Sequence, residues 1–186
     1  MSLRRGFKAE ANRISLSLRR GLGLLSHAPI DLFVLAERLG AHVVPLSEFA
    51  AECPDAVRHF THVETGAFSA ATVPLPNKRR VIIYNDRHSV GRRNSNLAHE
   101  IAHLALGHEF TLPIDTTGCR IIDRDVEDEA NWLGPTILIS NEAAMHILRQ
   151  AMGDGVACRE YGVTSAVLRM RINASGARIR MSRSYN

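Results

Sequence analysis

Residues 97–108 read LAHEIAHLALGH, in which His99, Glu100 and His103 interrupt a run of Leu, Ala and Ile. The apolar residues fall on almost every side of a helix with about 3.6 residues per turn, and this pattern predicts a buried helix. Imidazole and carboxylate groups in such surroundings cost on the order of a few kcal/mol each unless a partner satisfies them. We therefore expect these three polar side chains to share a binding partner.

The spacing of the two histidines predicts that this partner is a metal ion. Residues four apart on a helix differ by about 40° in direction and about 6 Å in height, so His99 and His103 can converge on one ion. Glu100 would then lie beside the ion without having to bind it. This is the HExxH pattern, in which two imidazoles bind zinc and the glutamate is the general base of a metalloprotease. The alternative is a pair of core histidines that are satisfied without a metal.

A zinc site of this kind needs a third ligand, for which the sequence offers two candidates. His108 is one residue out of register with the motif that uses a third histidine, and we expect it at the helix C-terminus, where an imidazole is favourable. Glu127, in the later stretch DVEDEAN, shares a helix face with Asn131, four residues on. Glu127 can ligate zinc while Asn131 hydrogen-bonds a ligand imidazole. The alternative for Glu127 is an acidic, solvated start of a helix.

The composition is that of an ordinary globular protein without a membrane-spanning segment. The chain has 186 residues, of which 45% are hydrophobic and 23% charged, which suits one domain with a real core. No stretch approaches the roughly 18 apolar residues of a membrane helix, and no apolar run of signal length follows the basic start. Cys53, Cys119 and Cys158 are odd in number and widely spaced. We therefore expect no disulfides, no membrane contact and a reducing cytoplasmic location.

Basic residues concentrate at both ends of the chain, although the net charge is only +4. Residues 1–20 hold six Arg or Lys and one Glu, and residues 159–186 hold six Arg and one Glu, so each end carries six minus one, or +5. Such ends suit nucleic acid or an acidic partner. The alternative is solvated terminal charge.

Hydrophobic periodicity and turn signals predict an α+β fold, with helices around a small sheet. Gly134-Pro135 must kink the helix expected over 123–140 or end it early. We expect a metallopeptidase domain with N-terminal helices over 1–152 and a basic C-terminal helical segment over 153–186, packed on the same domain. The expected helices are 8–20, 30–40, the HExxH helix ending at Gly107, 123–140 and 141–152. Two more helices are expected after residue 153, separated by a turn at Gly162. The expected strands are 41–46, 66–76 and 78–85.

Two segments together resemble the signature of the ImmA/IrrE-type zinc metallopeptidases. RRNSNLAHEIAHLALGH at 92–108 resembles the family's AHExxH helix, and VEDEANWLGPTILIS at 126–140 resembles its ExEAN helix, although Gly134-Pro135-Thr136 departs from the usual ending. The segments IDLFVLAERLGAHVVPL and EYGVTSAVLRMRI resemble the family's N-terminal helix and strand and its C-terminal helical part. The resemblance implies a zincin-like fold, with a small antiparallel or mixed sheet packed against the HExxH helix and a helix-turn-helix-like C-terminal segment.

The same resemblance implies the roles of the site residues. His99, His103 and Glu127 would bind one Zn²⁺ per chain, and Glu100 would be the catalytic base. A peptide substrate would lie extended against an exposed strand, for which RVIIYN at 80–85 is the candidate edge.

The implied activity is that of a zinc endopeptidase that cleaves a helix-turn-helix transcriptional repressor encoded nearby, in a stress or phage-defence response. In the family's CapP-like branch, from anti-phage operons, a cysteine restrains the enzyme. Cys119 lies between the two ligand helices and is the candidate for such an inhibitory fourth zinc ligand, since a thiolate binds zinc well. The alternative is an ordinary buried thiol.

A second interpretation belongs to a different functional class. The chain would be a DNA-binding or sensing module with a structural zinc site and no peptidase activity. The C-terminal arginines suit phosphate contacts in that case, and single-stranded DNA could also activate the peptidase of the first interpretation. The candidate DNA-contacting residues are Arg169, Arg171, Arg178 and Arg180.

Overall fold

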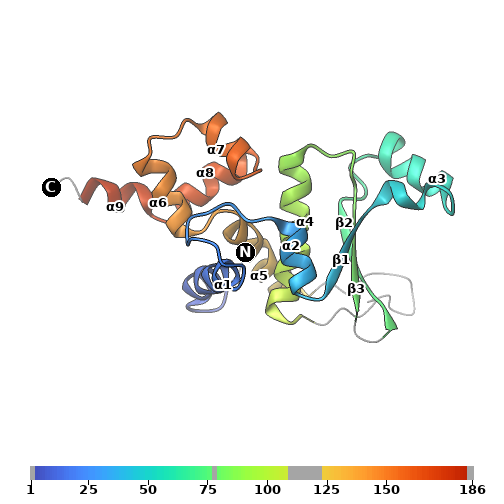
Figure 1. Cartoon of the computed structure of the whole chain (residues 1–186), viewed down its shortest axis with the longest axis horizontal. Helices are drawn as coiled ribbons and strands as arrows, with labels where there is room; N and C mark the ends of the chain where they lie inside the picture. The colour runs from blue at the N-terminus through green and yellow to red at the C-terminus, as the bar shows by residue number, and fades with distance from the viewer. Residues whose placement is uncertain (1–2, 77–78, 109–122, 184–186) are drawn as a thin grey trace.

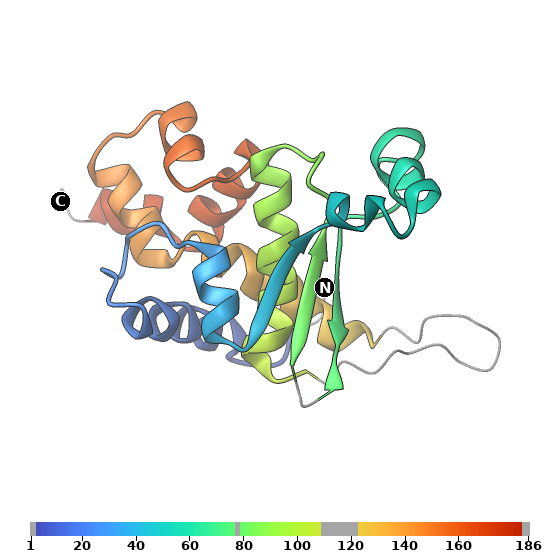
Figure 2. The same ribbon diagram turned by 45° about the vertical axis from the view of Figure 1, so that its right-hand side comes forward.

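The computed structural model describes residues 3–76, 79–108 and 123–183, and has the predicted α+β architecture. Figure 1 shows a small sheet on one side of the long helix α4, with the other large helices on the opposite side, and Figure 2 shows the same layers from a second direction. The helices are α1 (Phe7–Gly21), α2 (Leu32–Arg38), α3 (Pro54–Arg58), α4 (Val90–Leu106), α5 (Arg124–Leu138), α6 (Asn141–Arg149), α7 (Asp154–Glu160), α8 (Ser165–Ala174) and α9 (Ala177–Arg183), with short turns of helix at Leu46–Ala50 and His59–Val63.

The sheet is mixed and has the strand order β1-β3-β2. Strands β2 (Ala70–Pro74) and β3 (Arg80–Tyr84) form the predicted antiparallel hairpin, while β1 (Ala41–Pro45) pairs with β3 in parallel. The prediction that 80–85 forms an exposed edge is therefore wrong. β3 is the central strand because β1 returns from a distant part of the chain to cover its second side, and the edges of this sheet are β1 and β2.

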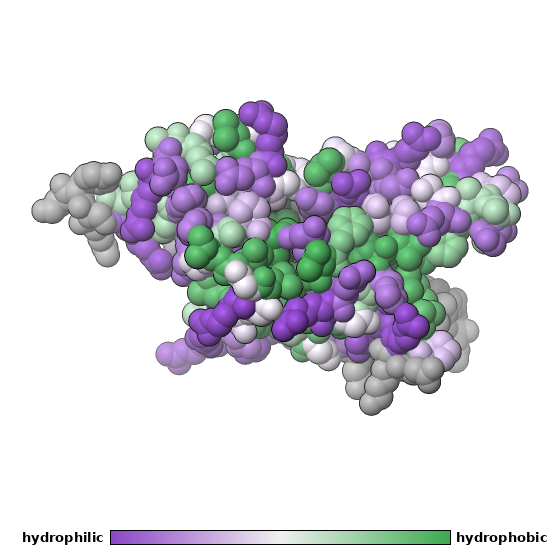
Figure 3. Space-filling view, viewed as in Figure 1, coloured by the Kyte–Doolittle hydropathy of each residue, from purple (hydrophilic) through white to green (hydrophobic). Residues whose placement is uncertain are grey.

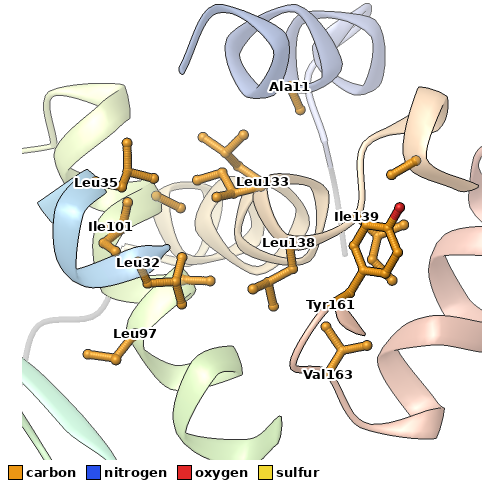
Figure 4. Packing of buried hydrophobic residues seen from close by; sticks show 14 of the residues in the cluster. Ala11, Leu32, Leu35, Leu97, Ile101, Leu133, Leu138, Ile139, Tyr161 and Val163 are labelled. Carbon is orange, nitrogen blue, oxygen red and sulfur yellow. The ribbon is translucent and has the colours of Figure 1, made fainter. Parts of the chain in front are cut away.

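The buried character predicted for the HExxH helix is confirmed. Leu97 and Ile101 of α4 are fully buried, as are Leu133 and Ile137 of α5, and α4 also contacts β2 and β3. Figure 4 shows how apolar side chains from these helices meet those of α1, α2 and the C-terminal part. The helix α4 is thus held between the sheet and α5, which fixes the direction of the side chains that face these two neighbours.

Helix α5 continues through Pro135 instead of ending before it. Two buried arginines donate hydrogen bonds to the carbonyl groups at the end of this helix. Arg19 of α1 donates from Nη2 to the carbonyls of Ile137 and Leu138, at 2.8 and 3.1 Å, and Arg171 of α8 donates from Nε to the carbonyl of Ile139, at 2.9 Å. Positive charge at a helix C-terminus is favourable, so α1 and α8 together stabilise the end of α5.

The C-terminal helices pack on the same core as the rest of the chain. Gly162 has a φ of 60° in the predicted turn between α7 and α8, and the Thr164 side chain caps α8. Asn94 of α4 donates to the carbonyl of Gly162 at 2.9 Å, and a Cβ at Gly91 would lie 2.8 Å from the backbone nitrogen of Thr164. The boundary between residues 152 and 153 stays a prediction.

Apolar and hydrophilic residues occupy different parts of the surface. Figure 3 shows apolar residues in the middle of the face viewed in Figure 1 and hydrophilic residues towards both ends. Phe33 and Val34 of α2 are 38% and 50% exposed. None of the helices in the described ranges combines the length and apolar character that a membrane crossing needs.

Candidate metal centre

Two histidines of α4 face each other one helical turn apart. The Nε2 atoms of His99 and His103 lie 3.1 Å apart, and the rings meet edge to face. Only 8% of His103 is exposed. Both imidazoles therefore direct the same nitrogen towards one point, as the HExxH spacing predicts.

Glu127 brings a carboxylate to the same point from the first turn of α5. Its two oxygens lie 3.3 Å from the Nε2 of His99 and 3.5 Å from the Nε2 of His103. Asp123 begins the helix, since its side chain accepts hydrogen bonds from the backbone of the first turn. The direction in which α5 starts is thus fixed just before Glu127.

Close packing of the two helices holds these donors together. A Cβ at Gly134 would lie 3.1 Å from the carbonyl atoms of Ala98 and 3.1 Å from the backbone nitrogen of His99. A side chain at this position would therefore push the two backbones apart by a few tenths of an ångström where α5 crosses α4 beside the first of the histidines. Because Gly134 lies two turns after Glu127, this crossing sets the distance between the carboxylate and the imidazoles.

The arrangement fits a small divalent cation. Ligands about 2.0–2.1 Å from a tetrahedral zinc ion lie about 3.3 Å from one another, and the three separations in the structure are 3.1, 3.3 and 3.5 Å. Within the described ranges, His99, His103 and Glu127 form the one group of metal-binding side chains that could hold an ion. Two imidazoles and one carboxylate are also a donor set that zinc accepts.

Glu100 projects from α4 towards the sheet. Its Oε2 accepts a hydrogen bond of 2.7 Å from the Thr72 hydroxyl of strand β2. The carboxylate is therefore held by the edge strand, while the histidines before and after it face α5. The sequence contains no signal for this contact, because it depends on the register of the hairpin against α4.

The environment of His103 favours a neutral imidazole. Burial, reinforced by the neighbouring His99 and His108, lowers the pKa of His103 from 6.5 to about 3. A neutral imidazole has the free electron pair that a metal ligand needs.

His108 has a contact that the sequence does not predict, whereas the structure shows no contact for Asn131 with a ligand imidazole in the described residues. His108 follows the C-cap of α4, as expected, but its Nδ1 also lies 2.9 Å from the Nδ1 of His103. Asn131, for which a contact with a ligand imidazole is predicted, is exposed on α5. The described contact to Nδ1 of His103 thus comes from His108. The role of Asn131 stays a prediction.

The four C-terminal arginines do not form one surface. Arg171 is only 2% exposed and is committed to the end of α5 and to the Asn141 side chain, so its predicted role in DNA contact is wrong. Its position on the inner face of α8 is the physical reason. Arg169, Arg178 and Arg180 are exposed, and their predicted DNA contacts stay predictions. Cys119 lies outside the described residues.

Most of the chain matches the model of a known protein family. Residues 36–173 match the peptidase M78 family, in the domain described as IrrE N-terminal-like. The match runs from α2 into α8 and includes every residue of the candidate metal centre. No curated protein matches the chain.

Proposed function

The chain belongs to the peptidase M78 family, with an IrrE N-terminal-like domain, and on this premise we propose that it is a zinc-dependent endopeptidase. In this proposal His99, His103 and Glu127 hold the metal, and Glu100 is the general base. The observation that carries it is the convergence of three donor atoms from α4 and α5, with Glu100 next to His99 on α4 and held by Thr72 of the sheet.

The described residues supply three protein ligands, the number typical of catalytic zinc sites, whereas structural sites usually have four. This favours a peptidase over a module with a purely structural metal. When bound, zinc supplies Lewis acidity towards a water molecule and towards the scissile carbonyl. Glu100 takes the proton of the attacking water and returns it to the leaving amine. Thr72 donates to Oε2 of Glu100, and in the part of the chain that the structure describes Oε1 is left for that water.

The substrate strand would run along β2. This strand is an edge of the sheet, and its Thr72 contacts Glu100, so a peptide added to β2 lies next to the base. Pairing with the outer edge of β2 provides main-chain hydrogen bonds that do not depend on the substrate's side chains. Only Pro74, at the end of the strand, has no backbone N–H to offer.

The resemblance to ImmA/IrrE-type proteins supports a more specific form of the proposal. The substrate would be a cytoplasmic helix-turn-helix repressor encoded nearby, whose cleavage relieves repression in a stress or phage-defence response. A CapP-like mode of control would add Cys119 as an inhibitory fourth ligand and single-stranded DNA as an activator. In that case Cys119→Ser cleaves the repressor faster than wild type in the absence of DNA.

The decisive experiment incubates the zinc-loaded protein with the neighbouring repressor, with and without single-stranded DNA. We expect one discrete cut by wild type and none by Glu100→Gln, with the same zinc content in both proteins. Zinc binding without cleavage by wild type would favour the DNA-binding or sensing module instead. Equal cleavage by Glu100→Gln would refute the role assigned to Glu100.

A further inference from the structure

We propose that His108 is a positioning residue for the metal centre, which fixes the tautomer and the direction of His103 through a polar relay to Glu129 and Arg4. This inference rests on the proposed metal site, but it concerns side chains that do not touch the metal.

The end of α4 is built so that His108 folds back over His103. Gly107 has a φ of 70°, a left-handed conformation that glycine adopts without strain. Its N–H donates to the carbonyl of Leu104, and the N–H of His108 donates to the carbonyl of His103, both at 3.1 Å. This is a Schellman motif, in which the second residue beyond the helix contacts the last turn. Here that contact joins two imidazoles in place of two apolar side chains.

The position of the protons follows from the chemistry of the ligand. Nε2 of His103 faces His99 and Glu127, so metal binding through Nε2 requires the ring proton on Nδ1. That N–H points at Nδ1 of His108, 2.9 Å away, which must then accept it. The proton of the neutral His108 ring is in consequence on Nε2, which lies 3.7 Å from Oε2 of Glu129.

The opposite arrangement would disable the site. If Nδ1 of His108 were the donor, the proton of neutral His103 would be on Nε2, where it blocks the metal. A negative charge beside Nε2 of His108 favours the productive arrangement, because it attracts the N–H to that side of the ring. Glu129 therefore selects the metal-binding tautomer of His103 through His108.

Glu129 is itself anchored. Its side chain is only 17% exposed, and its Oε1 accepts a hydrogen bond of 2.7 Å from Nε of Arg4. The same guanidinium donates twice to Glu10 of α1, at 2.7 Å each. The relay thus connects the metal ligand to α5, which also carries Glu127, and to the N-terminal segment.

The test compares His108→Leu with His108→Asn. Leucine fills similar space but cannot accept a hydrogen bond, whereas the Oδ1 of asparagine can occupy the place of Nδ1 and accept from His103. Zn²⁺ affinity is measured by competition with a chromogenic chelator, and the ligand field by the visible absorption spectrum of the Co²⁺-loaded protein. His146→Gln, on α6, is the control for loss of a histidine outside the site.

We expect His108→Leu to bind Zn²⁺ about 10–100-fold more weakly than wild type and to change the Co²⁺ spectrum. His108→Asn should recover most of the affinity, and Glu129→Gln should lie between wild type and His108→Leu. Thermal unfolding of the metal-free proteins shows whether each variant is folded, and His108→Asn and Glu129→Gln still test the relay if His108→Leu is not.

Two results would overturn the inference. Wild-type affinity in His108→Leu and Glu129→Gln would refute the relay while leaving the metal site intact. Absence of metal binding by wild type would refute the proposed function itself, together with the relay.

Discussion

Gly107 is the residue on which the geometry at the end of α4 depends most directly. Its φ of 70° is unfavourable for any residue with a Cβ, and nothing lies within 4 Å of the position that a Cβ would occupy. The cost of a substitution is therefore conformational and not steric. A loss of stability on substitution of Gly107 would therefore report backbone strain and not a steric clash.

We predict that Gly107→Ala lowers the free energy of unfolding by about 1–2 kcal/mol and also weakens Zn²⁺ binding, because His108 is displaced from His103. Denaturant unfolding of the metal-free protein and chelator competition measure the two effects. Gly155→Ala is the matched control, since Gly155 lies within α7 and a Cβ there meets only ordinary contacts. Equal stability of the two variants would contradict the assigned role of Gly107.

The burial of His103 predicts a pH dependence of the metal-free protein. Its pKa falls from 6.5 to about 3 on folding, so the folded state binds fewer protons than the unfolded state between these values. The stability associated with neutral His103 is fully present above pH 6.5 and is lost as the pH falls towards 3.

Urea unfolding at a series of pH values should therefore show a steeper loss of stability in metal-free wild type than in His103→Gln, by up to about 1.4 kcal/mol per pH unit. The comparison between the two proteins cancels the titration of groups that both contain. Parallel curves would show that His103 does not titrate differently in the folded state.

At the scale of elements, α5 is the helix whose course the sequence predicts least well. Its apolar stripe and its Asp123 start can be read from local residues, and so can the expectation that Gly134-Pro135 either kinks the helix or ends it early. The continuation to Leu138 depends on Arg19 and Arg171, which come from helices far away in the chain. Local patterns contain no information on such partners.

We predict that Arg171→Met lowers the free energy of unfolding by about 2–4 kcal/mol, because the buried carbonyl of Ile139 and the Asn141 side chain lose their donor. Arg169→Met, on the same helix, is the control and should change stability by less than about 0.5 kcal/mol. Chemical denaturation measures both. Equal effects would mean that the buried guanidinium contributes no more than an exposed one.

Dependence on distant parts of the chain also explains why the sequence predicts the wrong edge strand. The hairpin of β2 and β3 is a local structure with a turn between two strands, and it is predicted correctly. The parallel pairing of β1 with β3 joins residues about forty positions apart, such as Ala41 and Arg80, and no pattern within either strand predicts it. The edge strand next to Glu100 is consequently β2.

At the scale of the whole molecule, the metal centre connects parts that are distant in sequence. The spacing of His99, Glu100 and His103 is readable because all three lie on one helix. Glu127 is a candidate from the sequence alone, but only the family resemblance favours it over a solvated helix start, since its approach depends on how two helices cross. The contacts of Thr72 and His108 are invisible in the sequence because each depends on tertiary packing or on the backbone beyond the helix end.

Because the proposed ligands come from two helices, zinc should stabilise the entire fold. A ligand that binds only the folded state at 100 times its dissociation constant adds about 2.7 kcal/mol. We predict that chelation lowers the melting temperature of wild type and that added Zn²⁺ restores it. Glu127→Gln, measured by the same calorimetric scan, should show a much smaller response. A response equal to that of wild type would place the third ligand elsewhere.

The packing of Gly134 against α4 has a consequence for the choice of ion. A Cβ at residue 134 would lie only 3.1 Å from the backbone of Ala98 and His99, so a larger residue at 134 would move α4 and α5 apart. The separation of the three donor atoms therefore depends on the size of residue 134 as well as on the ligands themselves. A larger residue at position 134, which does not contact the ion, would therefore favour ions of greater radius, such as Cd²⁺.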